Sequence, residues 1–526
     1  MRAPLLLLLL SLPVGCQAPS AEPIVLDGRF DDWASVPAAV VDEADAPGAE
    51  VDFRTVRIAD EPRLVHVLID LGEGREINIQ RLDGCAKLLL DGDGNPATGR
   101  SMHGLHGVDV IISLTPPDKR APDRPGMGVG LESTTYEGDP EDEARPPLSP
   151  YDIGIALAPT YADRFVELRF ERGAELPDTP PFLRGDHFTA KLVLTDLADA
   201  VLDETDSFTH AMSPFAPAQP IQDAQQGDDP LARAPRSSLR VVAWNMQRGA
   251  LFKQRDSALR ILHALDPDII CIQELGKDSS AEQVAALLNQ ISAGGQTDAP
   301  RGAWSVLLGA GGGEKRSAVA ARLPLTTDKH LEPVLYPGRD DWLLRTAGAI
   351  VAHEGRRLIV MSIHLKCCGR IGDESDLRRI VEAKAIRAAV QEAMRAEHAD
   401  GIIIAGDFNL VGSRTPLDLL TGKIDREGLA LNAVEPMQLD RRSNATWTDR
   451  REPFVPGRLD FVLHDKAALQ AAGAFVFEAR DLAPRWLARH GLLVEDTAIS
   501  DHLPIVVDLS WRKASARSAG DEKNVH

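Results

Sequence analysis

The sequence has few cysteines for its length, with five among 526 residues. Four of them, Cys85, Cys271, Cys367 and Cys368, lie beyond the N-terminal segment, and four thiols in so long a chain do not make a disulfide framework. An oxidising compartment would permit one bridge. The adjacent Cys367 and Cys368 could form a strained vicinal disulfide, but two ordinary thiols are favoured, and neither is assigned a catalytic role.

Basic runs and aromatic residues are also scarce. No dense Lys/Arg run with interleaved aromatics occurs, which weakens a nucleic-acid interpretation without excluding it. The chain has only 4 Tyr and 7 Trp, and no apolar or aromatic segment suited to membrane docking stands out. Residues 1–230 hold 18 Lys and Arg against 41 Asp and Glu, whereas residues 231–526 hold 40 against 38. The front half should therefore repel polyanions, while the back half can accept a phosphate substrate if its basic groups cluster.

No apolar run at the N-terminus is long enough to span a bilayer. Arg2 precedes a largely apolar stretch over 5–12 and the sequence PVGC, which ends at Cys16. This pattern resembles a bacterial lipoprotein signal, with residues 1–15 removed and lipid attached to Cys16. Pro13 departs from the usual Leu, so an ordinary signal peptide stays an alternative. Either case predicts export to the cell envelope, as a membrane-anchored lipoprotein, or to the extracellular space.

The length predicts two domains. Residues 22–210 contain short strand-like runs separated by Gly, Pro and Asp turns, a pattern typical of an all-β sandwich. The Pro-rich stretch 116–150 is expected to be a surface excursion, and 211–238 a Pro-rich linker. Residues 239–512 alternate apolar strands with helices, which predicts sheets covered by helices. Residues 513–526 are expected to be a disordered tail. The fold class is therefore α+β.

Two segments of the front domain, LDGRFDDW and LLLDGDGNPATGR, resemble the sugar-binding-like or cell-surface sandwich modules found beside secreted bacterial enzymes. The resemblance implies a possible glycan or surface partner. Asp91, Asp93 and Asn95 have the alternate spacing that can offer oxygens to Ca²⁺. An EF-hand loop would need Gly and Glu where Pro96 and Met102 stand, so a plain Asp/Gly turn is favoured over calcium.

Polar residues stand at the ends of six apolar strands in the back half. Residues 402–413 read IIIAGDFNLVGS, in which a buried strand turns at Gly406 and presents a carboxylate and an amide. Taken alone, this could be a turn in which Asp and Asn bond their own backbone. Six such positions together favour a functional site; they are Asn245, Glu274, His364, Asp407 with Asn409, Asp460, and Asp501 with His502.

The ordered motifs VVAWNMQRG, IICIQE, SIHLK, GDFN, RLDFVL and SDHLP resemble the endonuclease/exonuclease/phosphatase superfamily. The likeness covers 239 to about 512. It implies a four-layered α/β sandwich (DNase I-like) and hydrolysis of phosphate esters. Hydrolysis of this kind needs a hard divalent cation, Mg²⁺ or Mn²⁺, and an activated water.

The resemblance assigns a role to each strand-end residue. Glu274 and Asn245 would bind the metal, Asp407 would activate water, and Asn409 would orient it. His364 and His502 would contact phosphate.

Two further carboxylates are assigned with their roles left open. Asp460 would bind a second metal or hold the other histidine, the one that is not adjacent to Asp501. Asp501 would assist a histidine or the metal, because a neighbouring carboxylate holds an imidazole in one orientation and raises its pKa.

Basic residues beside these motifs are weaker candidates for phosphate binding. Lys315 and Arg316 follow the flexible GAGGGE segment, and Arg345 precedes the strand of His364. Solvated surface charge is the default for all three. Trp447 and Trp342 are interpreted as core in preference to substrate platforms.

The sequence thus predicts a secreted, Mg²⁺-dependent phosphodiesterase that uses in-line attack of water. Nuclease is the first substrate class, with DNA or RNA as substrate. A sphingomyelinase-like phospholipid diesterase is one alternative. A non-catalytic surface-binding protein is the other.

Overall fold

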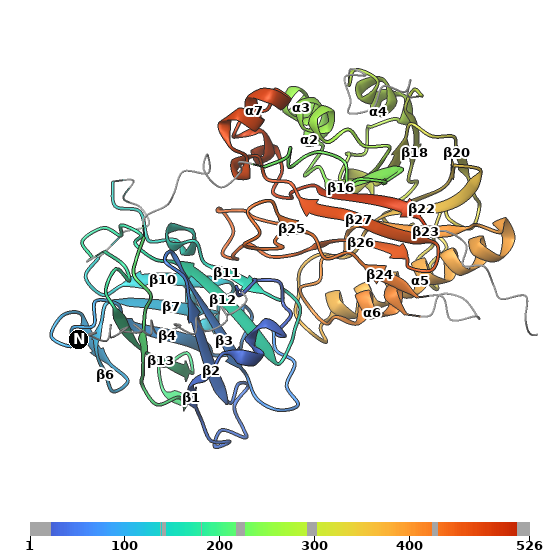
Figure 1. Ribbon diagram of the computed structural model, residues 1–526. Coiled ribbons are helices and arrows are strands. Elements are labelled where there is room, and N and C mark those ends of the chain that lie inside the picture. The colour runs from blue at the N-terminus through green and yellow to red at the C-terminus, as the bar shows by residue number, and fades with distance from the viewer. Residues whose placement is uncertain are drawn as a thin grey trace, which may run out of the picture.

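The computed structural model describes residues 23–512 apart from 137, 139–141, 143, 180, 217–226, 292–301 and 423–429. The predicted signal segment with Cys16, the tail 513–526 and part of the linker lie outside the described residues. The chain forms an N-terminal all-β region and a C-terminal region of sheets and helices (Figure 1). Among the helices described, none is long and apolar enough to cross a membrane.

The N-terminal region has two antiparallel sheets whose inward faces share one apolar core. The first contains, in spatial order, β1 (Ala38–Val41), β2 (Thr55–Asp60), β3 (Leu64–Asp70), β12 (Phe165–Glu171) and β11 (Ala156–Ala158). The second contains β10 (Val129–Ser133), β7 (Val110–Leu114), β4 (Cys85–Asp91), β13 (His187–Thr195) and β14 (Val201–Glu204), with β15 (Phe208–Ala211) also paired to β13. Two small ribbons are added by β5 (Arg100–Met102) with β6 (Leu105–Val108), and β8 (Pro117–Asp118) with β9 (Ala121–Pro125).

The prediction that 116–150 is only a surface excursion was wrong in part. Strand β10 pairs with β7 and buries Val129 and Leu131 in the core shared by the two N-terminal sheets. Alternating apolar residues in the sequence VGLES carry this strand, but the many surrounding prolines and charges conceal it.

Two sheets packed face to face form the centre of the C-terminal region. The first contains β18 (Ser305–Leu308), β19 (Ala318–Ala321), β17 (Ile269–Gln273), β16 (Leu239–Asn245), β28 (Ile505–Trp511), β27 (Leu469–Val476) and β25 (Met437–Gln438). The second contains β20 (Leu325–Thr327), β21 (Thr346–His353), β22 (Arg356–His364), β23 (Gly401–Asp407), β26 (Asp460–Asp465) and β24 (Leu431–Ala433). Side chains from both sheets fill one apolar layer between them.

Helices cover the outer faces of the two sheets and complete four layers (Figure 1). The first sheet is covered by α2 (Ala250–Lys253), α3 (Arg255–Leu265), α4 (Ala281–Leu288) and α7 (Pro484–His490). The second is covered by α5 (Glu374–Glu397) and α6 (Thr415–Thr421). Short 3₁₀ turns are η1 (Asp32–Ser35), η2 (Pro150–Ile153), η3 (Gly313–Lys315), η4 (Ala479–Asp481) and η5 (Asp496–Ile499). The predicted α+β class with a four-layered sandwich is confirmed.

Three central strands of the two C-terminal sheets are buried along their whole length, and their polar residues stand at the strand ends. Every residue of β16, β17 and β23 is buried, because each strand lies inside a sheet whose two faces are covered. Such strands place side chains on both faces in hydrophobic layers, so polar residues are confined to the strand ends. These ends therefore gather the polar groups of both sheets.

Candidate active site

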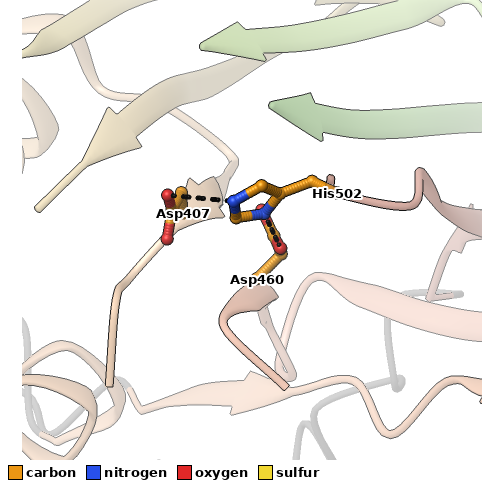
Figure 2. A group of neighbouring side chains, drawn as sticks. All are labelled: Asp407, Asp460 and His502. Carbon is orange, nitrogen blue, oxygen red and sulfur yellow. Dashed lines mark hydrogen bonds and ion pairs between the residues drawn. The ribbon is translucent and has the colours of Figure 1, made fainter. Parts of the chain in front are cut away.

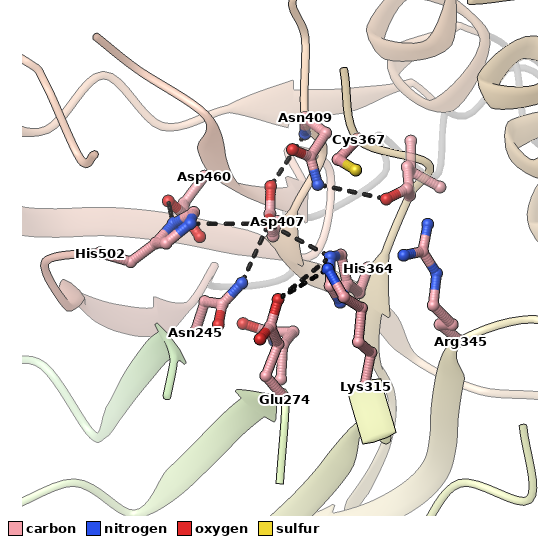
Figure 3. Close-up of polar contacts among 12 residues, drawn as sticks. Asn245, Glu274, Lys315, Arg345, His364, Cys367, Asp407, Asn409, Asp460 and His502 are labelled. Carbon is pink, nitrogen blue, oxygen red and sulfur yellow. Dashed lines mark hydrogen bonds and ion pairs between the residues drawn. The ribbon is translucent and has the colours of Figure 1, made fainter. Parts of the chain in front are cut away.

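Strand register brings three of the predicted residues side by side. His364 pairs with Asp407 in the parallel β22–β23 ladder, and Asp407 pairs with Asp460 in the antiparallel β23–β26 ladder. In the other sheet, Asn245 ends β16 and Glu274 directly follows β17. The two sheets therefore present their polar ends to the same space (Figure 3).

The turn at Gly406 requires glycine and directs the Asp407 carboxylate into the site. Gly406 has φ +139°, and a Cβ there would lie 2.2 Å from the Ile363 carbonyl oxygen, so only glycine fits. Oδ1 of Asp407 accepts a hydrogen bond from the Asn409 amide at 2.9 Å, and Asn409 Nδ2 donates to the Leu365 carbonyl at 3.2 Å. Asp407 thus makes the local turn bond and still offers Oδ2 to the site.

His502 lies between two carboxylates (Figure 2). Its Nδ1 is 2.7 Å from Oδ2 of Asp460, and its Nε2 is 3.8 Å from Oδ2 of Asp407. Burial alone would lower the pKa of His502, but Asp460, Asp407 and Asp501 raise it to about 10. The imidazole is therefore held as a cation that can donate a proton.

Asp407 has a buried carboxylate with an unusual affinity for protons. Its Oδ2 accepts from Asn245 Nδ2 at 3.0 Å and is 3.5 Å from Nε2 of His364. Burial raises the pKa of Asp407 to about 7, with Asp460 adding to the rise while His502 and Asn245 oppose it. A carboxylate poised near neutrality can exchange protons with water at physiological pH.

Glu274 and His364 complete the polar cluster. Oε1 of Glu274 lies 3.3 Å from Lys315 Nζ and 3.8 Å from His364 Nε2, and Oε2 accepts from the Arg248 amide at 3.0 Å. Burial favours a raised pKa for Glu274, yet Lys315 and the Arg248 amide bring it below its ordinary value. Burial, Arg345, Lys315 and His502 lower the pKa of His364 well below 6.5, so this imidazole is neutral.

The donor set suits a hard divalent cation. The ligand atoms of Asp407, Asp460 and His502 lie within 4.8 Å of one another, and buried Asn245 and Glu274 belong to the same polar cluster (Figure 3). Oδ1 of Asp460 is buried without a hydrogen-bond partner among the described residues. Oxygen donors of this type are the ligands that Mg²⁺ and Mn²⁺ select.

Asp501 is oriented by a tryptophan. Oδ2 of Asp501 accepts from Trp447 Nε1 at 3.3 Å, whereas the carboxylate that contacts His502 Nδ1 is Asp460. Asp501 contributes to the charge around His502 without a hydrogen bond to that ring in the described structure. Trp447, interpreted as core, lines the active-site cavity.

The weaker basic candidates divide into two groups. Lys315 lines the cavity and approaches Glu274. The side chain of Arg316 donates to the carbonyls of Gly309 and Ser279, and so is directed away from the site. Arg345 is mostly buried behind His364, with Nη2 4.0 Å from Glu382, and does not line the cavity.

The adjacent cysteines lie at the rim as thiols. The Cys368 thiol donates to Cys367 Sγ at 3.0 Å, and both residues line the cavity without a disulfide.

The Asp/Gly turn of the N-terminal domain is present. Oδ1 of Asp91 and of Asp93 both accept from the Asn95 amide, at 3.0 and 2.9 Å. Asp109, which the sequence pattern did not suggest, joins Asp91 and Asp93 with ligand atoms within 4.8 Å of one another.

Comparison with known proteins gives one family and several remote structural likenesses. Residues 242–502 match the model of the Endonuclease/Exonuclease/phosphatase family. No curated protein matches the chain. The human Nocturnin catalytic domain with bound sulfate is similar at 20% identity, over 56% of this chain and 100% of that one, with TM-score 0.37. The 3′ phosphatase NExo from Neisseria, bound to product DNA hairpin, is similar at 16% identity (52% and 100% covered, TM-score 0.36). D. rerio TDP2 complexed with single-strand DNA product is similar at 17% identity, over 52% of this chain and 98% of that one, with TM-score 0.34.

Proposed function

We propose that the protein is a metal-dependent hydrolase of ester bonds whose substrates are phosphodiesters, a proposal that the match of residues 242–502 to the endonuclease/exonuclease/phosphatase family supports. The observation that carries the proposal is the paired arrangement of Asp407 and His502. One is a buried carboxylate with a pKa near 7 and the other a buried imidazolium, 3.8 Å apart. Groups whose environments separate their proton affinities serve as acid and base.

Each side chain then has a defined task in the hydrolysis. Asp407 takes a proton from the attacking water, and Asn409 orients that water with it. His502, kept charged by Asp460, stabilises the charge that develops on phosphate oxygen and gives a proton to the leaving oxygen. His364 stays neutral and donates a hydrogen bond to phosphate. Asp501 contributes negative charge beside His502.

We propose Mg²⁺, with Mn²⁺ as a substitute, as the resident cation. Glu274 and Asn245 would hold it, and a second cation at Asp460 Oδ1 is the alternative to a purely positioning role for that residue. A bound Mg²⁺ neutralises phosphate oxygen and the charge that develops in the transition state. Lys315, paired with Glu274 at 3.3 Å, adds positive charge to the same cavity.

Metal removal tests this proposal. Hydrolysis of bis(p-nitrophenyl) phosphate by the full chain should disappear with EDTA and return with Mg²⁺. Glu274→Gln should raise the Mg²⁺ concentration needed for half-maximal rate at least about tenfold, since even outer partners of metal ligands change affinity by about 10–100-fold. Glu282→Gln, on the exposed face of α4, is the matched control. Activity that persists in EDTA would contradict the proposal.

Nucleic acid is the first substrate class that we propose, because DNA and RNA fragments are common phosphodiesters outside cells. A phospholipid diesterase of the sphingomyelinase kind is the second class, and vesicles of sphingomyelin in the same assay separate the two. A purely surface-binding role would predict no turnover of any ester.

We propose that the protein is exported as a lipoprotein anchored through Cys16, a location that agrees with this choice of substrate. The support is the short apolar run and PVGC sequence at 1–16. Cells that express the chain should incorporate labelled palmitate into the wild type but not into Cys16→Ser, which should collect in the precursor form. Equal labelling of both forms would contradict the anchor.

The N-terminal domain has two further proposed ligands. Ca²⁺ binding is supported by the carboxylates of Asp91, Asp93 and Asp109. A glycan or surface partner is supported only by the sequence resemblance of the module.

A further inference from the structure

The active-site cavity is built by both domains. A cavity of about 350 Å³ is lined by Asp407, His502 and Glu274 of the catalytic domain. The same cavity is lined by two segments of the N-terminal sandwich, 77–81 and 159–166. The sandwich therefore forms a wall of the catalytic cavity and is not a remote appendage.

Hydrogen bonds hold this wall in place at three catalytic-domain loops that flank the site. They join the Ile371 amide to Asn78 Oδ1 at 2.7 Å, the Ala162 amide to the Gly412 carbonyl at 2.7 Å, and Thr160 Oγ1 to the Arg458 carbonyl at 2.8 Å. Buried main-chain groups paired across an interface fix its geometry, because each unmade bond would cost desolvation.

A fourth loop of the catalytic domain inserts into the sandwich. Val455 is 2% exposed and belongs to the apolar core shared by the two N-terminal sheets. The Val129 amide donates to the Pro453 carbonyl at 2.9 Å, and Tyr151 Oη donates to the Phe454 carbonyl at 3.1 Å. Trp447 and Phe454 of this loop, which is closed by the pairing of Trp447 with Gly457, both line the cavity. Separation of the domains would expose Val455 and dismantle that side of the site.

Arg81 is the cation that the described sandwich residues place in the cavity. Its guanidinium carbon lies 4.9 Å from the centroid of the Phe454 ring. The guanidinium makes no hydrogen bond or ion pair with the residues that the structure describes, while the Arg81 amide donates to the Asn78 carbonyl at 2.8 Å and the Arg81 carbonyl accepts from Arg370 Nη1 at 3.5 Å. A half-buried guanidinium held over an aromatic ring, with its donors free, is suited to an anionic group of a ligand.

Size and charge both argue against the interior of a long duplex in this cavity. A cavity of this volume lies at the lower end of the range that encloses small ligands. Asp163 of the sandwich and Glu452 of the inserted loop line it as well, and residues 1–230 carry 41 acidic against 18 basic residues. The acidic wall repels the flanking phosphates of a duplex laid across the site. One compact diester has a single phosphate, and the cations that line the cavity, such as Arg81 and Lys315, are sufficient to bind it.

We propose that Arg81 is a substrate-binding residue contributed by the N-terminal domain, and that the wall around it restricts the enzyme to compact phosphodiesters, excluding the interior of a duplex. This inference rests on the proposed function and names the substrate class of the same site. Arg81 binds an anionic oxygen of the substrate, while Ile77, Ile79 and Phe165 pack against its apolar part.

Kinetics of the full-length protein on bis(p-nitrophenyl) phosphate test the role of Arg81. Arg81→Met should raise KM about tenfold with kcat little changed, because the lost contact acts on binding. Arg81→Lys should recover part of the loss, since it restores charge but not the planar fork. Arg124→Met removes one exposed arginine from the same domain, outside the cavity, and should behave as wild type. Thermal unfolding of all four proteins shows whether Arg81→Met keeps its fold.

The outcomes separate this inference from the function beneath it. The proposal is supported if the wild type hydrolyses the small diester but does not nick closed-circular plasmid, and if Arg81→Met raises KM for the small diester. An unchanged KM in Arg81→Met, or plasmid nicking under the same conditions, would overturn it while leaving the phosphodiesterase intact. Absence of any wild-type turnover would overturn the proposed function itself, and the inference with it.

Discussion

Replacing Asp407 by Asn is expected to lower kcat for bis(p-nitrophenyl) phosphate by about 10³-fold, within the range that general base catalysis contributes. The substitution keeps the shape of the side chain and the oxygen that accepts from the Asn409 amide at 2.9 Å. It removes the proton acceptor at Oδ2 and places an NH₂ group against the donor Nδ2 of Asn245. The loss should therefore fall on turnover much more than on folding.

Stability separates a catalytic role for Asp407 from a structural one. Burial raises the pKa of Asp407 to about 7, so a neutral amide at this position relieves the cost of a buried charge, which offsets the lost hydrogen bond from Asn245, and Tm should change little. Asp418→Asn, on the exposed side of α6, is the control and should match wild type in both measurements. A variant that keeps more than about a tenth of wild-type kcat would remove Asp407 from the chemistry.

Loss of His502 is expected to be as severe, and Asp460 should matter only through it. His502→Ala should lower kcat about 10³-fold, and Asp460→Asn about 10²-fold, since the carboxylate 2.7 Å from Nδ1 orients the ring and keeps it charged. The double variant should be no slower than His502→Ala alone, because an orienting residue has nothing left to orient.

The same cycle decides between the two roles of Asp460. Multiplied effects, near 10⁵-fold in the double variant, would show that Asp460 acts independently of His502, as a ligand of a second metal would. The pH profile gives another readout. Asp460 raises the pKa of His502, which stands at about 10, so the alkaline limb of kcat should move to lower pH in Asp460→Asn. A limb that stays in place would contradict the positioning role.

The strand-end residues could be predicted from sequence because they are polar residues that directly follow fully apolar runs. A fully apolar run such as Ile402–Ala405 must be buried on both faces, so Asp407 and Asn409 after its glycine stand out. Which of these residues lie close together could be predicted only from the ordered motifs of the family, because no local pattern specifies that β22, β23 and β26 pair with one another.

Contacts between distant segments could not be predicted. Adjacency in sequence suggested Asp501 as the partner of His502, yet consecutive side chains point apart and the contact falls to Asp460, 42 residues earlier. Likewise Arg81 stands in a loop without a motif, and only the packing of the N-terminal all-β region beside the active site brings it to the cavity. Tertiary packing, which single-sequence patterns do not encode, makes both assignments.

The most direct test of hydrolysis by attack of water at phosphorus is a single-turnover reaction of bis(p-nitrophenyl) phosphate in H₂¹⁸O with Mg²⁺, followed by mass spectrometry of both products. Water activated by Asp407 and directed at phosphorus should place one ¹⁸O in the phosphate product and none in nitrophenol. Label in nitrophenol, or no turnover with a folded, Mg²⁺-loaded protein, would contradict the account.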